Sequence, residues 1–148
     1  MYYEEVTSLL GYTGEMPPVE NGSCSLDIND IFYGFEQTEE GNFRLVYIVV
    51  DELAADVSIF REIRIGDSIQ SVFSKIPARD TELRQWAYQT LYGTDQYDTA
   101  GYAQLDYVAM SYYTINIVTP AGGIHLSVTR DGMQLYHVEM YGPELSAG

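Results

Sequence analysis

The chain has 148 residues, a formal net charge of −15 at pH 7 and a hydrophobic content of 46%. This apolar content can build a core, which excludes a disordered protein and leaves one domain or two small ones. The charge repels nucleic-acid phosphates, so DNA and RNA are excluded as partners. No apolar run reaches the roughly 20 residues of a membrane span. No signal peptide is visible at the N-terminus, and a mature exported protein would look the same.

The first 65 residues predict one helix and three strands. Residues 3–10 form the helix, because Val6, Leu9 and Leu10 share one helical face and Gly11 can end it. A loop rich in Gly and Pro follows over 14–25. β-Branched and aromatic side chains, separated by turns at Glu39–Asn42 and near Asp51, then predict three strands. These strands are 30–37, 43–50 and 57–65.

The second part of the chain begins with another helix. Asp67 or Ser68 can cap it, an apolar stripe at helical spacing follows (Ile69, Val72, Phe73, Ile76), and Pro77 prevents its continuation. The remaining pattern predicts a third helix over 81–92, a polar loop over 94–106 and strands over 107–118, 124–130 and 133–141. Alternation of apolar and polar residues in 124–130 is typical of a half-buried strand.

The order helix, strand, strand, strand therefore occurs twice. Segment 57–66 also aligns without a gap with 133–142, at low identity, so chance similarity is an open alternative. The preferred interpretation is an α+β fold of two tandem helix-plus-antiparallel-sheet repeats, 1–65 and 66–148. We expect them to form one compact body, with the helices packed on one face of the sheet and the other face open.

Segment Arg64–Pro77 resembles the start of β-lactamase inhibitor protein-like and SmpA/OmlA-like domains, in which a Gly leads into a helix of the form G-x-S-x-x-x-V. The tandem order extends the resemblance over most of the chain. It implies a non-enzymatic domain that binds proteins through an exposed sheet face and its hairpin loops, in exported or lipid-anchored bacterial envelope proteins. The family's inhibitor carries a disulfide in each repeat. Cys24 is the single cysteine here, so the resemblance does not extend to β-lactamase inhibition.

No catalytic, cofactor or metal site is predicted, and the chain is expected not to be an enzyme. His125 and His137 lack metal-ligand spacing and align with Arg44 and Arg61 of the other repeat, which favours exposed strand positions. There is no nucleophile elbow and no phosphate-binding loop. Asp27, Asn29 and Asp30 lack the Gly and the terminal Glu of a calcium-binding loop, so an Asx-rich turn is expected.

The expected binding residues combine acids with tyrosine. The chain holds 14 Tyr, an amphipathic residue that suits binding faces, although core packing is an open alternative. Glu39 and Glu40 are predicted at a hairpin tip. The predicted contact residues are Glu39, Glu40, Tyr112, His125 and Tyr136. Apolar residues at alternating and intervening positions of 133–141 suggest that something covers the open face.

These observations predict a non-enzymatic protein-binding module of a bacterial envelope or secreted protein, contacting its partner through the open sheet face and the hairpin loops. The partner is an unknown protein, for which a basic surface or a second copy of this chain are candidates. The alternative is a cytosolic acidic inhibitor or immunity protein that masks a basic surface. Localisation is accordingly expected to be extracellular or at the cell envelope, with cytoplasmic as the alternative.

Overall fold

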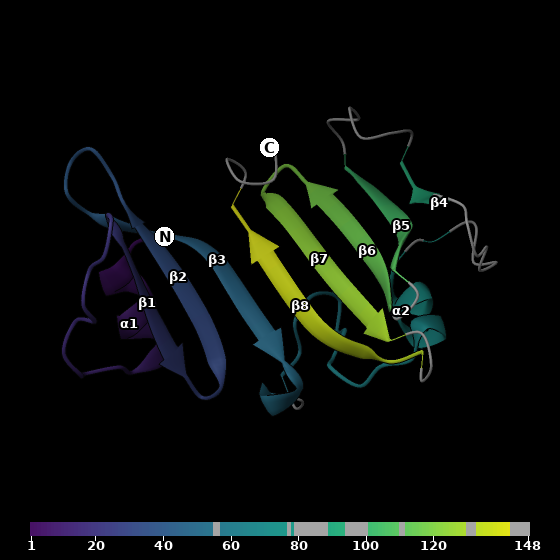
Figure 1. The fold of residues 1–148 in the computed structure, drawn as a ribbon, viewed down its shortest axis with the longest axis horizontal. Helices are drawn as coiled ribbons and strands as arrows, with labels where there is room; N and C mark the ends of the chain where they lie inside the picture. Colours follow the sequence, from purple (N-terminus) through teal and green to yellow (C-terminus); the bar gives the residue numbers. More distant parts are fainter. Residues whose placement is uncertain are drawn as a thin grey trace.

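A computed structural model describes residues 1–54, 57–76, 78, 89–93, 101–109, 112–129 and 133–142. Eight strands form one antiparallel sheet in the order β1-β2-β3-β8-β7-β6-β5-β4, and two short helices lie behind it (Figure 1). The strands are β1 Ser23–Ile28, β2 Ile31–Gln37, β3 Phe43–Asp51, β4 Gln89–Tyr92, β5 Tyr102–Ala109, β6 Tyr112–Thr119, β7 Gly122–Thr129 and β8 Leu135–Tyr141. The helices are α1 Tyr3–Leu10 and α2 Ile69–Lys75, with a 3-10 turn at Glu52–Ala54.

Local sequence signals explain the first hairpins. Asn29 and Asp30 both have positive φ, 52° and 65°, as the two central residues of a tight hairpin turn require. This two-residue turn joins β1 to β2 and confirms the Asx-rich turn expected from the sequence. The predicted turn at residues 39–42 also forms, because Thr38 N–H donates to Asn42 O and Gly41 N–H donates to Thr38 O.

The prediction of an α+β fold with two helix-plus-sheet repeats was wrong. Strands β1 to β3 and strands β4 to β8 belong to one continuous sheet, joined where β3 pairs with β8 from Tyr47↔Tyr141 to Asp51↔His137. Among the described residues, the α-helices have only 8 and 7 residues, so the fold is mostly β. The alignment of 57–66 with 133–142 led to the wrong prediction of a repeat. The second segment contains β8, whereas the first runs through turns with one isolated bridge, Ser58↔Arg64.

Other element predictions failed for related reasons. Residues 23–25 were predicted to end the Gly- and Pro-rich loop 14–25, yet they begin the edge strand β1, in which Cys24 and Leu26 are buried. Part of the expected polar loop 94–106 belongs to β5. Residues 89–92, expected to end a third helix, form β4, while 81–88 lie outside the described residues. β4 is a four-residue strand at the edge of the sheet, too short for an alternating pattern to distinguish it from the end of a helix.

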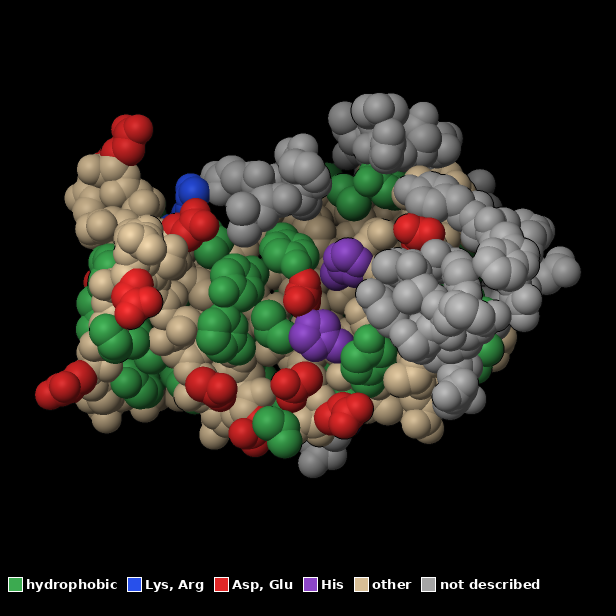
Figure 2. Space-filling view, in the orientation of Figure 1, with side chains coloured by type: hydrophobic (Ala, Val, Ile, Leu, Met, Phe, Trp, Pro, Cys, Tyr) green, Lys and Arg blue, Asp and Glu red, His purple; other side chains and the backbone are tan. Residues whose placement is uncertain are grey.

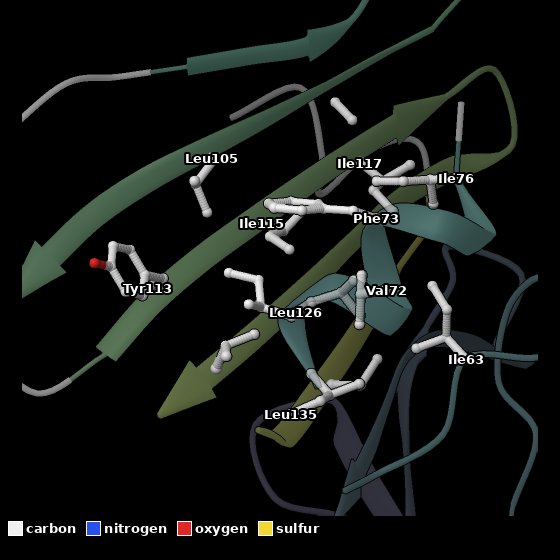
Figure 3. Packing of buried hydrophobic residues seen from close by; sticks show 14 of the residues in the cluster. Ile63, Val72, Phe73, Ile76, Leu105, Tyr113, Ile115, Ile117, Leu126 and Leu135 are labelled. Carbon is white, nitrogen blue, oxygen red and sulfur yellow. The ribbon is translucent and has the colours of Figure 1, made fainter. Parts of the chain in front are cut away.

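The main core lies between α2 and the C-terminal half of the sheet. Of the two predicted caps, Ser68 is the one that caps α2, its Oγ accepting a hydrogen bond from Ser71 N–H at 3.1 Å. Val72 and Phe73 then project onto the sheet, and both are at most 4% exposed. Figure 3 shows these two side chains facing inward-pointing residues of the strands, among them Leu105, Ile115, Ile117, Leu126 and Leu135.

A second core cluster lies under α1. Val6 packs with Cys24, Leu26 and Phe35, and the Tyr3 ring meets the Phe35 ring edge-on at 5.3 Å. Ile48 contacts both core clusters and pairs with Met140 of β8, so the two clusters lie on the same side of the sheet. Both helices therefore cover one face, which we call the covered face. We call the opposite face the open face.

A register shift explains the apolar pattern of the last strand. Between β7 and β8 the pairing shifts at Ser127/Val128, where the partners pass from His137 to Leu135. This bulge places both Leu135 and Val138 in the core, although they are an odd number of residues apart. The mixed pattern in 133–141 therefore does not indicate cover on the open face, contrary to the expectation from the sequence.

Candidate functional site

Strand register brings polar side chains together on the open face of β5 to β8. One row across the sheet pairs Asn116 with His125 and His125 with Glu139, and the next row pairs Ser127 with Thr114 and with His137. Together they line a hollow of about 310 Å³, which we call the polar hollow. Its lining residues are Asp106, Thr114, Asn116, His125, Ser127, His137 and Glu139. Figure 2 shows both histidines at this surface, with acidic side chains beside them.

The carboxylate of Glu139 is held by its two neighbours on the same face of β8. His137 Nε2–H donates to Glu139 Oε1 at 3.0 Å, and Tyr141 O–H donates to Glu139 Oε2. Residues 137, 139 and 141 are two positions apart and so project to the same side of a strand. The carboxylate is thus fixed at the boundary between the polar hollow and the tyrosine ring, with lone pairs remaining for a ligand.

The surroundings shift the pKa values of these groups. Burial alone would raise the pKa of the Glu139 carboxyl, but hydrogen bonds from Tyr141 and His137, together with the two histidines, hold it below its ordinary value. Burial and the hydrogen bond to Glu139 raise the pKa of Tyr141 to about 12. Burial lowers the pKa of His125 despite the nearby Glu139 carboxylate. At neutral pH the site therefore combines an ionised Glu139, a protonated Tyr141 phenol and a neutral His125.

An aromatic strip continues from the polar hollow toward β2, and we define it as Phe32, Tyr47 and Tyr141. The Phe32 and Tyr47 rings are stacked with centroids 5.6 Å apart, and the Tyr47 and Tyr141 centroids lie 6.5 Å apart. Tyr47 pairs with Gly34 and covers it: a Cβ at Gly34 would lie only 2.4 Å from the Tyr47 ring. A glycine in the middle of β2 thus allows this ring to lie close against the sheet.

The predicted contact residues do not form one cluster. His125 lies in the polar hollow, half-buried rather than fully exposed. Glu39 and Glu40 are exposed in the β2–β3 hairpin. This hairpin precedes the start of β3, whereas Glu139 pairs with Val49 near the other end of that strand. Tyr136 is half-buried with its ring 6.3 Å from that of His137. The side chain of Tyr112 lies outside the described residues.

Sequence reasoning missed Glu139, Tyr141 and Tyr47 as site residues. The alternation of His137, Glu139 and Tyr141 in β8 carried the signal for the first two. Nothing local connects Tyr47 with them, because the pairing of β3 with β8 joins segments almost a hundred residues apart. The missing information was the sheet order.

Metal binding and thiol chemistry find no support among the described side chains. No group of three or more His, Cys, Asp or Glu side chains among them could hold a metal ion. Cys24 is buried against α1, and burial raises the pKa of its thiol, which makes it a poor nucleophile. Within the same described segments, no helix has both the length and the apolar character needed to traverse a bilayer. The arrangement is suited to binding, with hydrogen-bonding groups beside aromatic rings.

Comparison with solved structures finds a similar fold in the 1.5 Å crystal structure of an extracellular protein containing an SCP domain from Bacillus anthracis str. Ames. The TM-score is 0.56 at 15% identity, and the match covers 97% of this chain but 44% of that one. At this identity the likeness concerns the fold alone. No family model matches the chain, and neither does any curated protein. The resemblance to β-lactamase inhibitor protein-like domains stays a prediction.

Proposed function

We propose that this chain is a non-catalytic module that binds a partner protein through the open face of its sheet. The observation that carries the proposal is the aromatic strip lying beside the polar hollow on that face. Protein interfaces combine aromatic anchors with a polar rim that excludes water and fixes orientation. The strip and the hollow supply these two components side by side.

Packing of the sheet supports different roles for its two faces. The covered face is occupied by α1 and α2, and its side chains are committed to the core. Phe32, Tyr47 and Tyr141 are only half-buried on the other face. Large aromatic side chains that keep contact area and a polar tip available are characteristic of binding surfaces. The β2–β3 hairpin, with Glu39 and Glu40 exposed, extends from the same sheet and can add contacts at its rim.

An extracellular or cell-envelope setting is part of the proposal. It is supported by the fold similarity to an extracellular bacterial protein, of which this chain spans less than half. A domain of this kind would act within a larger exported protein or beside one. The cytosolic inhibitor alternative, in which the chain masks a basic surface, stays a prediction.

Site-specific photo-crosslinking tests the proposed face directly. A photoreactive phenylalanine derivative replaces Tyr47 in one variant and Leu9 in a control variant, because Leu9 is 73% exposed on α1. Both variants are exposed to surface extract of the source organism and irradiated. We expect one defined crosslinked protein from position 47 and none of that mass from position 9. Equal products from both positions, or none from position 47, would contradict binding through the open face.

The same experiment tests whether the partner is a second copy of the chain. A crosslinked product of twice the chain mass, formed by the purified protein alone from position 47, assigns the open face to a homodimer. Sedimentation of the unmodified protein then gives the oligomeric state, and the Tyr47 variant serves as its matched control.

A further inference from the structure

We infer that the boundary formed by Tyr47, Glu139 and Tyr141 receives a lysine or arginine side chain of the partner protein. This inference rests on the proposed function and specifies the chemistry of the partner. A basic side chain has an apolar stem and a cationic head, so it needs an aromatic surface next to an ionised carboxylate. The open face provides the two in contact with each other.

The geometry places the carboxylate at the end of the aromatic strip. Tyr141 pairs directly with Tyr47 across β8 and β3, and their ring centroids are 6.5 Å apart. Glu139 lies two residues before Tyr141 and accepts its phenolic hydrogen bond. A stem lying on the two rings would therefore bring its ammonium or guanidinium group to the Glu139 carboxylate, without any rearrangement of the strands.

Hydrogen bonds hold this carboxylate in one orientation. Glu139 Oε1 and Oε2 each accept one bond, from His137 and Tyr141 respectively. A carboxylate offers about four lone-pair sites, so acceptor capacity is left for an incoming donor. Because the acid is already fixed, less side-chain entropy is lost when a cation binds than with a freely rotating surface glutamate.

The charge of the sheet favours a cation over other ligands. Across the eight strands that the structure describes, Arg44 is the one Lys or Arg, and it lies in register with Glu36 rather than with the site. The row next to Glu139 begins with Asp51, paired with His137, and reaches Asp106 on β5. An anionic partner would meet these carboxylates with no Lys or Arg in register with them on the described strands. A cationic side chain meets complementary charge and aromatic faces together.

A lysine-containing peptide tests the inference on the whole chain. The probe is an unstructured peptide of lysines separated by glycine and serine, and its control is the same peptide with every lysine Nε-acetylated. Affinity is measured by calorimetry at low salt, and the contact is mapped from amide shifts in ¹⁵N spectra. We expect shifts centred on Tyr47, Glu139 and Tyr141, and at least about tenfold weaker binding of the acetylated peptide.

Three variants separate a specific site from general attraction to an acidic protein. Glu139→Gln removes the carboxylate charge in an isosteric side chain, and we expect affinity to fall about tenfold. Glu39→Gln removes the same charge at the exposed hairpin and should change affinity less than about twofold. Tyr141→Phe keeps the ring and should retain more affinity than Tyr141→Leu, which removes the aromatic face. Amide spectra confirm that each variant keeps the fold.

Two results would overturn the inference. One is equal weakening by Glu39→Gln and Glu139→Gln, because that pattern indicates diffuse attraction to the net charge. The other is a crosslinked partner at position 47 whose binding is unaffected by Glu139→Gln. In that second case the open face still binds protein and only the basic side chain is excluded, so the failure differs from a failure of the proposed function, in which position 47 yields no crosslink.

Discussion

The two faces of this sheet differ in what their side chains can do. On the covered face, Leu126 and Val138 are fully buried and contribute to the core under α2. On the open face, their immediate neighbours His125 and Glu139 line the polar hollow. Because successive side chains of a strand point to opposite sides, one short segment supplies both surfaces. This difference predicts that stability and partner binding can be altered separately by substituting adjacent residues.

The largest expected effect comes from removing a core side chain on the covered side. Phe73 is 4% exposed on α2 and packs against the sheet. We expect Phe73→Ala to lower the free energy of unfolding by about 3–5 kcal/mol, through lost apolar burial and the cavity left behind. Denaturant unfolding measures it. If the loss were no larger than that of an open-face substitution such as His125→Ala, the two faces would not differ as described.

Two glycines allow a steric clash with the backbone to be compared with a steric clash with a side chain. Gly122 has φ of 143°, and a Cβ there would lie 2.0 Å from the Tyr141 carbonyl oxygen. We expect Gly122→Ala to destabilise the fold by about 3 kcal/mol, because neither the torsion nor the strand can adapt cheaply. Gly34→Ala conflicts only with the Tyr47 ring, so a loss of about 1 kcal/mol is expected. Chemical denaturation of both variants gives the ranking, and the reverse order would contradict this account.

Gly34→Ala also sharpens the role of the aromatic strip. The added methyl group forces the Tyr47 ring away from the sheet, while the covered face is untouched. We therefore expect weaker binding of the lysine peptide with most of the stability retained, observed by calorimetry and unfolding in parallel. Unchanged affinity would show that the position of the Tyr47 ring is not needed.

A smaller effect is expected from pH. Burial lowers the pKa of His125 below its ordinary value of 6.5, so the unfolded chain binds its proton more readily than the folded chain does. The stability linked to neutral His125 is therefore present above pH 6.5 and decreases as pH falls below it. The lowered pKa of Glu139 acts in the same direction at more acidic pH. Urea unfolding between pH 5 and 7.5 should show a slope that His125→Gln removes, while a persisting slope would assign it to other groups.

The phenol of Tyr141 gives the most local prediction. Its pKa of about 12 depends on burial and on the hydrogen bond to the Glu139 carboxylate. Replacing Glu139 by Gln removes the negative charge that opposes phenol ionisation, so the Tyr141 pKa should fall toward its ordinary value of 10. Carbon-labelled tyrosine followed by NMR through an alkaline titration measures this. A value that does not change in Glu139→Gln would exclude the contact.

Local patterns were sufficient to predict several elements of the fold. The capping serine and helical stripe of α2 were identified, as were the turn after β2 and the alternation that marks β7. Each of these signals lies within one short segment of the sequence. The strand expected over 57–65 failed because its β-branched residues pack into the core from turns rather than from a sheet. Strand propensity reflects how well a side chain fits a half-buried surface, so it does not distinguish a strand from turns that pack into the core.

The candidate site was harder to predict than the elements. His125 was predicted as an exposed strand residue from its alignment with Arg44, and it lies half-buried in the polar hollow. The aromatic strip depends on β2, β3 and β8 being neighbours, and the expected division into two repeats concealed this order. The one local indication of the aromatic strip was a glycine within a strand, because Gly34 leaves space that a residue on the neighbouring strand can fill.

Adjacent residues of β8 provide the most direct test that one face stabilises and the other recognises. Affinity for the lysine peptide is measured for Val138→Ala and Glu139→Gln, with unfolding free energy recorded for each. The account predicts that Val138→Ala loses about 2–3 kcal/mol of stability and keeps its affinity. It predicts that Glu139→Gln remains within about 1 kcal/mol of the parent stability and binds about tenfold more weakly. Loss of affinity in both variants, or in Val138→Ala alone, would contradict it.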